Sequence, residues 1–354
     1  MAAQIAIISS TRPIANRIYL DHAATTPLRP EAKAAMEEGF RLWANPSSPH
    51  AEGRKARAML EDARERIKTA LGWEGELIFT SGASEALAIG LGRSRFKRTV
   101  ASSVEHDAVY RAAPSAKVLP LENREVVLPD DLHDAVVAIQ QVNSETGAMM
   151  LEMRNVAATV AERGGVLLAD CSQGAGEWPL PACHMAVVSA HKLGGPVGIG
   201  ALLVKDLAML EPVGGHERGY RAGTENLPAA LGFAAAVEAS RKREAEEVQV
   251  MRSQFSERTA PFRLITGQVH DDRIFALAHP SMTAQALLIR LDALGFAVSA
   301  GSACSSGTLK RSRVLEAFGV DADIAARTIR VSLGWSTSGD DLDRLVAAWS
   351  SLLP

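Results

Sequence analysis

Hydrophobic and polar positions follow two different periods along much of the chain. Residues 52–71 repeat small and apolar side chains at i, i+3 and i+4 spacing with opposite charges between them, which predicts an amphipathic helix. Further helices are expected from residue 81 onward and over 156–165, where glycines follow the last apolar position. Short apolar runs predict strands over 76–80, 166–170, 186–190 and 198–205, and residues 139–143 are another strand candidate.

The alternation of these helices and strands predicts an α/β fold with a mostly parallel central sheet flanked by helices. Residues 230–257 are expected to form one long helix, whose charged second half suits a connector between domains. A smaller α+β domain is expected beyond it. Its apolar runs lie at 273–279, 296–301 and 328–334, and its helical patterns at 283–295 and 340–353. We predict a large domain over 16–250 and a small domain formed by 1–15 and 251–354.

Composition and charge indicate a globular protein and argue against nucleic-acid-binding, membrane-spanning and secreted classes. The 354 residues are 47% hydrophobic, which is enough for a large core and two domains. The net charge of −3 predicts no nucleic-acid partner, and no apolar run is long enough for a membrane span. The N-terminal residues lack the basic start of a secretory signal, so we expect a cytoplasmic protein. The three cysteines, Cys171, Cys183 and Cys304, are too widely spaced for a zinc cage or a disulfide framework.

Polar residues follow several predicted strands, where open α/β sheets bind their ligands. The segment Ser81–Ser84 is either a simple helix cap or a phosphate site, because small residues let backbone N–H groups approach an anion. Asp170 is either a loop carboxylate or a partly buried group that needs a cation, such as a protonated pyridine nitrogen. Each segment taken alone leaves both interpretations open.

Two further residues extend this pattern. Lys192 is either a solvated charge or a desolvated amine that can form a Schiff base, and the glycines after it leave room for a flat ligand. His106 is either a satisfied polar residue or a ring that stacks on an aromatic ligand and moves protons. A phosphate site, a pyridinium partner, a Schiff-base lysine and a stacking histidine together meet the requirements of pyridoxal phosphate (PLP).

The chain resembles the cysteine desulfurases, which are class V aminotransferases among the fold-type I PLP-dependent transferases. The stretches HKLGGPVGIGAL and GSACSSG are the most specific part of this resemblance. The matching stretches, in family order, are YLDHAATTPLRPEA, NPSSPHAEGRKAR, FTSGASEA, VEHDAV, VNSETG, ADCSQ, SAHKLGGPVGIGALLV, GGHERGYRAGTEN, SAGSACSSG and TIRVSLGW.

The resemblance implies a role for most residues of the site. Lys192 would hold PLP covalently, Asp170 would pair with the pyridine nitrogen, and His106 would stack on the ring. Gln173 would reach the phenolic oxygen. The cofactor-binding residues implied on the phosphate side are Ala83, Ser84, Ser189 and His191.

The resemblance also implies a homodimer, because Thr224 matches a threonine that reaches the phosphate from the second subunit. Arg330 matches the arginine that clamps the substrate α-carboxylate, and Asn143 and Ser144 lie in a substrate-binding segment. Ser144 replaces a usual asparagine, and Trp335 follows SLG where the family has arginine. These departures bear on substrate preference more than on PLP binding.

Cys304 falls where the family keeps its nucleophile, on a glycine- and serine-rich segment that suits a thiol that must reach substrate and then deliver sulfur. The implied reaction converts L-cysteine to L-alanine and leaves a persulfide on Cys304. A protein sulfur acceptor or iron–sulfur scaffold, in cluster or thio-cofactor assembly, would receive the sulfur. No metal site is expected. Two alternatives stay open. One is another class V PLP enzyme (an aminotransferase, selenocysteine lyase or sulfinate desulfinase) in which Cys304 is incidental, and the other is a non-catalytic assembly partner.

Overall fold

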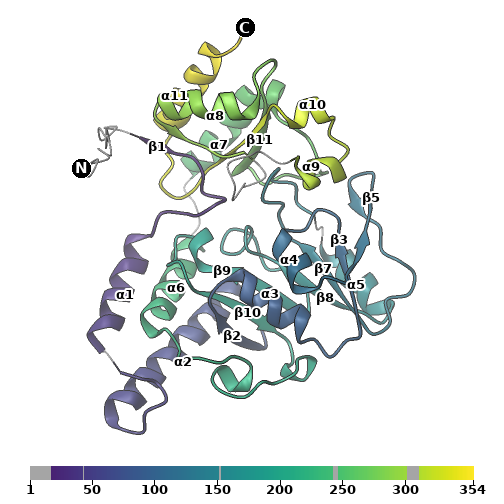
Figure 1. Cartoon of the computed structure of the whole chain (residues 1–354). Coiled ribbons are helices and arrows are strands. Elements are labelled where there is room, and N and C mark those ends of the chain that lie inside the picture. Colours follow the sequence, from purple (N-terminus) through teal and green to yellow (C-terminus); the bar gives the residue numbers. More distant parts are fainter. Residues whose placement is uncertain (1–16, 43, 151–152, 242–245, 301–310) are drawn as a thin grey trace, which may run out of the picture.

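The computed structural model describes residues 17–42, 44–150, 153–241, 246–300 and 311–354 (Figure 1). Its largest sheet has seven strands in the order β2-β10-β9-β8-β7-β3-β4. These strands are β2 (Glu76–Thr80), β3 (Arg98–Ser102), β4 (Lys117–Leu119), β7 (Ala135–Gln140), β8 (Val166–Asp170), β9 (Met185–Ser189) and β10 (Gly200–Val204). Only β10 runs antiparallel to its neighbours in this sheet, so the predicted mostly parallel α/β sheet is confirmed.

Alternate residues of the central strands enter two separate hydrophobic clusters, one on each face of the sheet. Val137 and Ile139 of β7 pack in the first cluster, whereas Val136 and Ala138 pack in the second. The first is covered by α1 (Pro30–Leu42), α2 (Ala51–Leu71), α5 (Met153–Glu162) and α6 (Leu227–Ser240), and the second by α3 (Ala83–Gly92) and α4 (Asp107–Ala112). Burial on both faces explains why these strands read as continuous apolar runs.

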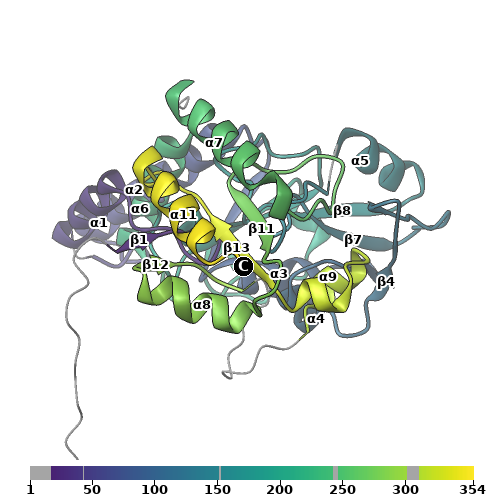
Figure 2. The same cartoon turned by 90° about the horizontal axis from the view of Figure 1, so that it is seen from above.

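A third hydrophobic cluster lies at the other end of the molecule (Figures 1 and 2). It surrounds two small sheets, in which β11 (Ile274–Ala278) pairs with β13 (Thr328–Ser332) and β1 (Ile18–Tyr19) pairs with β12 (Phe296–Ala297). The helices that pack on them are α7 (Glu246–Thr259), α8 (Ala284–Ala293) and α11 (Gly339–Ser351). Two short helices, α9 (Arg313–Ala317) and α10 (Ala322–Ala325), follow one another before β13, and a separate hairpin joins β5 (Leu121–Glu122) to β6 (Glu125–Val126).

The structure differs from the predicted single helix over 230–257. Helix α6 ends at Ser240, and α7 begins at Glu246; residues 242–245 lie outside the described ranges. The two helices serve different cores, because α6 is apolar on nearly all sides and lies in the first cluster, whereas Phe255 of α7 packs in the third. Ile18 and Leu20 also pack in the third cluster. The domain boundaries at residues 15 and 250 stay a prediction.

No helix within the described ranges is both long and apolar enough to cross a membrane.

Candidate active site

The polar residues predicted at strand ends gather at one edge of the large sheet. Asp170 ends β8, and Ser189 ends β9, which runs parallel to it. Gly200, the first residue of antiparallel β10, pairs with Ser189 on one side and with Thr80 at the end of β2 on the other. A Cβ on Gly200 would lie 2.6 Å from the Val188 carbonyl oxygen and 2.8 Å from Gly82 Cα, so only glycine lets the turn after β2 close against β10.

The turn after β2 leaves backbone donors at the start of α3. Gly82 is the N-cap residue, and no side chain in the described part of the chain caps it, so the simple capping role weighed for Ser81 and Ser84 is not found. Ser81 instead donates its N–H to Glu85 Oε2 at 2.5 Å. Ser84 lies exposed on the first turn of the ten-residue helix, beside Ala83. This arrangement favours the anion-binding interpretation of the segment.

Asp170 has one carboxylate oxygen engaged and one available. The side chain is 9% exposed, and Oδ1 accepts hydrogen bonds from the Ser172 N–H at 2.9 Å and from Ser172 Oγ at 2.5 Å. Oδ2 accepts no hydrogen bond from the residues that the structure describes. A nearly buried carboxylate with a free oxygen fits a protonated pyridine nitrogen, so this residue meets the requirement set by PLP.

Lys192 ends the 3-10 turn Ala190–Lys192 that follows β9. Burial lowers the pKa of its ammonium group; the Asp170 carboxylate opposes that shift, and the Arg330 cation adds to it. The main chain here is fixed by Thr26, whose N–H donates to the His191 carbonyl at 2.8 Å and whose Oγ1 donates to the Lys192 carbonyl at 3.0 Å. A lowered pKa increases the neutral amine that a Schiff-base lysine needs.

His106 is the N-cap residue of α4. Its Nδ1 accepts the Ala108 N–H at 3.1 Å, so the neutral ring carries its proton on Nε2. Burial lowers the pKa of this imidazole, and the nearby Lys192 cation lowers it further, while Asp170 opposes both effects. His106 also lies near Asp170 in the fold, because the side chain of the preceding Glu105 accepts the N–H of Gln140, which is opposite Asp170 in the register of β7 and β8.

Arg330, on β13, reaches the same site from the smaller sheets. Its side chain is 6% exposed; Nη1 donates to the Ser144 carbonyl at 2.9 Å, and Nη2 pairs with Asp21 Oδ1 at 2.8 Å. Its Nε is buried and has no hydrogen-bond partner among the described atoms. A buried N–H without an acceptor is costly, and a substrate carboxylate would satisfy it.

Comparison with known proteins decides the family. The Aminotransferase class-V sequence profile matches residues 18–345. The chain belongs to the class V aminotransferase family. It is 32% identical over 365 residues to the cysteine desulfurase IscS of Dictyoglomus turgidum, and the alignment covers 92% of each chain. The structure resembles a NifS-like protein from Rickettsia africae with a TM-score of 0.85 and 25% identity, covering 95% of this chain and 99% of that one.

A second structural relative is SspA in complex with cysteine, with a TM-score of 0.74, 25% identity, and coverage of 90% of this chain and 99% of that chain. The predicted resemblance to the cysteine desulfurases and the fold-type I architecture are therefore confirmed. PLP is the cofactor of this class V family, in agreement with the sequence prediction.

The substrate-side turn of this class V protein is built around Asn143. Its Oδ1 accepts the N–H groups of Glu145 and Thr146, each at 3.0 Å, and its Nδ2 donates to the Val104 carbonyl at 3.3 Å. The asparagine therefore fixes the turn, and the Ser144 main chain rather than its hydroxyl contacts Arg330. Direct substrate contacts by Asn143 and Ser144 stay a prediction.

Lys192 and Gln173 line one pocket, and Gln173 Nε2 donates to the Ala23 carbonyl at 2.9 Å. The other residues that line it are His22, Ala23, Thr26, Arg29, Glu177, Leu193, Arg273, Ile274, Ser332, Leu333, Gly334 and Trp335. Arg29, Glu177 and Arg273 were not predicted. Arg29 lies inside the motif YLDHAATTPLRPEA and could have been considered, whereas Arg273 and Glu177 lie in no recognised stretch.

The remaining predicted residues lie around this edge or outside it. His191 is half-buried and its Nδ1 lies 3.1 Å from Thr25 Oγ1, and Ser189 is buried. Thr224 is exposed on the segment before α6, so its predicted reach into a second subunit stays a prediction. Cys304 lies outside the described residues. The described residues contain no cluster of His, Cys, Asp and Glu that could hold a metal ion.

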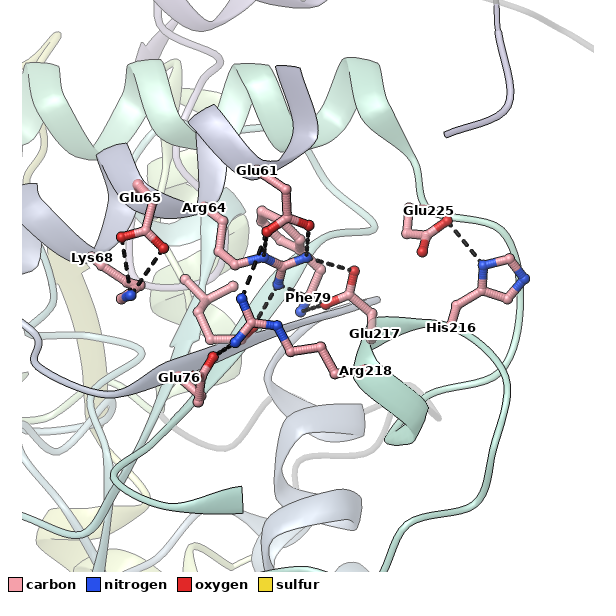
Figure 3. A network of polar contacts seen from close by, with 11 residues as sticks. Glu61, Arg64, Glu65, Lys68, Glu76, Phe79, His216, Glu217, Arg218 and Glu225 are labelled. Atoms are coloured by element: carbon pink, nitrogen blue, oxygen red, sulfur yellow. Dashed lines mark hydrogen bonds and ion pairs between the residues drawn. The ribbon is translucent and has the colours of Figure 1, made fainter. Parts of the chain in front are cut away.

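A buried ion pair between Arg64 and Glu217 lies at the start of residues 217–224, the segment that leads to Thr224 (Figure 3). Arg64 of α2 donates from Nη1 to Glu217 Oε2 at 2.8 Å, and the same oxygen accepts the Phe79 N–H of β2 at 2.8 Å. Glu217 has the left-handed φ of 48°, which is unusual for a residue with a side chain. The ion pair therefore fixes a strained turn against the sheet.

Proposed function

We propose that this chain is a cysteine desulfurase that converts L-cysteine to L-alanine and receives the sulfur on Cys304 as a persulfide, for iron–sulfur cluster or thio-cofactor assembly. One observation carries the proposal: the neighbouring strands β7, β8 and β9 end in the turn that Arg330 contacts, in Asp170 and in the turn of Lys192, and the buried Nε of Arg330 has no partner among the described atoms. This supports a site in which an amine, an anchor for a pyridinium nitrogen and an anchor for a carboxylate act together. The cysteine-bound relative has the same fold.

PLP, when bound, supplies an electron sink for the bonds at the substrate Cα. The free Oδ2 of Asp170 would hold the pyridine nitrogen in its protonated form. The unpartnered Nε of Arg330 would bind the α-carboxylate and so orient the substrate. Lys192, as a neutral amine, would accept the Cα proton.

The sulfur step is assigned to Cys304 on the resemblance. Its thiolate would attack the substrate sulfur, so that an S–S bond forms as the substrate C–S bond breaks. The electron pair of the broken bond stays with the three-carbon fragment, which leaves as alanine after protonation. His106, whose neutral ring would carry its proton on Nε2, would move a proton in this step.

The decisive experiment measures alanine and sulfide from L-cysteine, with PLP and a thiol reductant, for the wild type and Cys304→Ala. We expect the wild type to form both products, and the variant to form neither while keeping the visible absorbance of bound PLP. Undiminished turnover by the variant would favour another class V reaction, and absence of PLP absorbance in the wild type would favour a non-catalytic partner.

We also propose a homodimer in which Thr224 completes the phosphate site of the second subunit, and a protein sulfur acceptor in the cytoplasm. The exposed position of Thr224 is compatible with the first proposal. Light scattering of the purified protein tests the dimer, and Thr224→Val tests the contact, because it should weaken PLP binding without changing the measured mass.

A further inference from the structure

Helix α9 begins with two residues that reach back to the large sheet. Ser312, which is 7% exposed, donates from Oγ to Glu145 Oε2 at 2.6 Å and accepts the Leu315 N–H at 3.0 Å. It therefore caps its own helix and joins that helix to the turn that contacts Arg330. The next residue, Arg313, has its main chain fixed by these bonds.

The Arg313 guanidinium lies against the turn that precedes His106. Nη2 donates to the Glu105 carbonyl at 2.6 Å, and Nη1 donates to the Ser103 carbonyl. The same group lies over the Tyr110 ring, with 4.5 Å between Cζ and the ring centroid. Two charge-assisted bonds to main-chain oxygens and one cation–π contact hold a short turn more strongly than neutral bonds would.

The turn that Arg313 contacts is also bonded to the end of strand β7. Glu105 is fully buried, and its Oε1 accepts the Gln140 N–H at 2.9 Å, next to Asp170 in the register of β7 and β8. Its Oε2 has no partner among the described atoms. Arg313 thus holds the Glu105 carbonyl, and the Gln140 N–H of β7 holds the Glu105 side chain. His106 follows Glu105 directly, so these two contacts limit where its ring can lie.

We propose that Arg313 is a positioning residue that fixes the orientation of the His106 ring toward the cofactor by holding the carbonyls of Ser103 and Glu105. Its side chain contacts the carbonyls of Ser103 and Glu105, Asp107 and Tyr110, so it would act through His106. The inference rests on the proposed function, since it requires PLP to lie against His106. A loosened turn would let the imidazole leave its stacking position while Lys192 and Asp170 keep theirs.

The test compares Arg313→Met, Arg313→Lys and Arg313→Ala with the matched control Arg311→Met. Arg311 is exposed and precedes helix α9, and its Nε lies 3.5 Å from Oε2 of Glu316 on that helix. Its loss therefore removes a nearby cation that makes no contact with the His106 turn. Each variant is converted to the apo form and titrated with PLP while the absorbance spectrum of the bound cofactor is recorded. Steady-state kinetics with L-cysteine follow on the reloaded enzyme.

For Arg313→Met we expect about tenfold weaker PLP binding, an altered spectrum of bound PLP, and a kcat reduced about tenfold at nearly constant KM. Arg313→Lys should lie between Arg313→Met and the wild type, and Arg311→Met should match the wild type. Ethylguanidinium added to Arg313→Ala should restore the spectrum, because it replaces the missing group and cannot repair a general folding defect.

Two outcomes would overturn the inference. The first is that Arg313→Met matches Arg311→Met in PLP affinity, spectrum and kcat. The second is that Arg313→Ala loses PLP binding without any response to ethylguanidinium. A wild type that binds no PLP would instead reject the proposed function itself. The two failures are therefore distinguishable.

Discussion

Asp21 orients Arg330 from the opposite end of the chain, with 2.8 Å between Asp21 Oδ1 and Arg330 Nη2. The contact spans 309 positions of sequence and is supported by a bridge between Asp21 and Ser332, two residues after Arg330 on β13. One edge of the guanidinium is thus engaged, and the buried Nε remains for a ligand.

Arg330→Lys should therefore raise the KM for L-cysteine about 10- to 100-fold, because lysine lacks a second fixed donor for the carboxylate. PLP binding should stay at the wild-type level. Steady-state kinetics and the absorbance of bound PLP measure both quantities. Arg327→Lys is the matched control, since Arg327 lies nearby on the chain but donates to the carbonyls of Asp323 and His279. An unchanged KM in Arg330→Lys would remove Arg330 from the substrate site.

Lys192→Ala should lower kcat about 10²- to 10⁴-fold, the range expected when a positioned general base is removed. The variant should still bind PLP reversibly through Asp170 and the phosphate-side donors. Rapid-mixing or steady-state assays of alanine formation test the rate, and dialysis tests the reversibility. Lys205→Ala serves as the control because Lys205 stacks over Trp73, with 5.1 Å between Nζ and the ring centroid, at the far end of β10. Retained activity in Lys192→Ala would contradict the assignment.

His22 should make stability depend on pH in the acidic range. It is 3% exposed, and burial lowers its pKa from 6.5 to about 4. The unfolded chain therefore binds a proton between those values while the folded chain does not. The free energy of unfolding should then fall, by about 1–3 kcal/mol from this residue, as the pH drops from about 6.5 to 4.

Urea unfolding of the wild type and His22→Gln at several pH values between 7 and 4 tests this expectation. The slope of stability against pH should be shallower in His22→Gln. His133→Gln is the control, because His133 is exposed and should leave the slope unchanged. Equal slopes for His22→Gln and the wild type would show that His22 does not remain neutral in the folded protein.

Local sequence patterns predicted the parts of the site that depend on local structure. Asp170 could be placed at a strand end because four apolar residues precede it. Lys192 could be placed in the turn after a strand because an apolar run precedes it and glycines follow it. Strand β3 (Arg98–Ser102) was missed, since its run RTVAS is too polar to be recognised although it pairs with both β4 and β7.

Contacts between distant segments leave no such periodic signal. Arg313 and Glu105 are separated by 208 positions, and neither the helix pattern around one nor the motif around the other indicates that they meet. The sequence predicted one helix where the structure has α6 and α7, because both segments favour helix. The two helices differ in the hydrophobic cluster that each one packs in. Tertiary packing overrides local preference at such points.

The buried pair of Arg64 and Glu217 gives a final prediction, on stability. Their side chains are 2% and 1% exposed, so removing one partner leaves the other charge buried without its fully buried counterion, although Arg64 keeps a contact with the half-exposed Glu61. Glu217→Gln or Arg64→Met should destabilise the fold by about 3–5 kcal/mol, whereas the double variant should lose less than the sum of the two. Glu38→Gln, which removes an exposed partner of Arg41, should cost at most about 0.5 kcal/mol.

Chemical denaturation of the four variants measures these differences. Because Glu217 also accepts the Phe79 N–H and begins the segment that leads to Thr224, its loss should weaken PLP binding as well, if the second subunit uses Thr224. A Glu217→Gln variant with wild-type stability would mean that the pair is replaced by other contacts. Lost stability with unchanged PLP affinity would separate the role of the pair in folding from any role in the composite site.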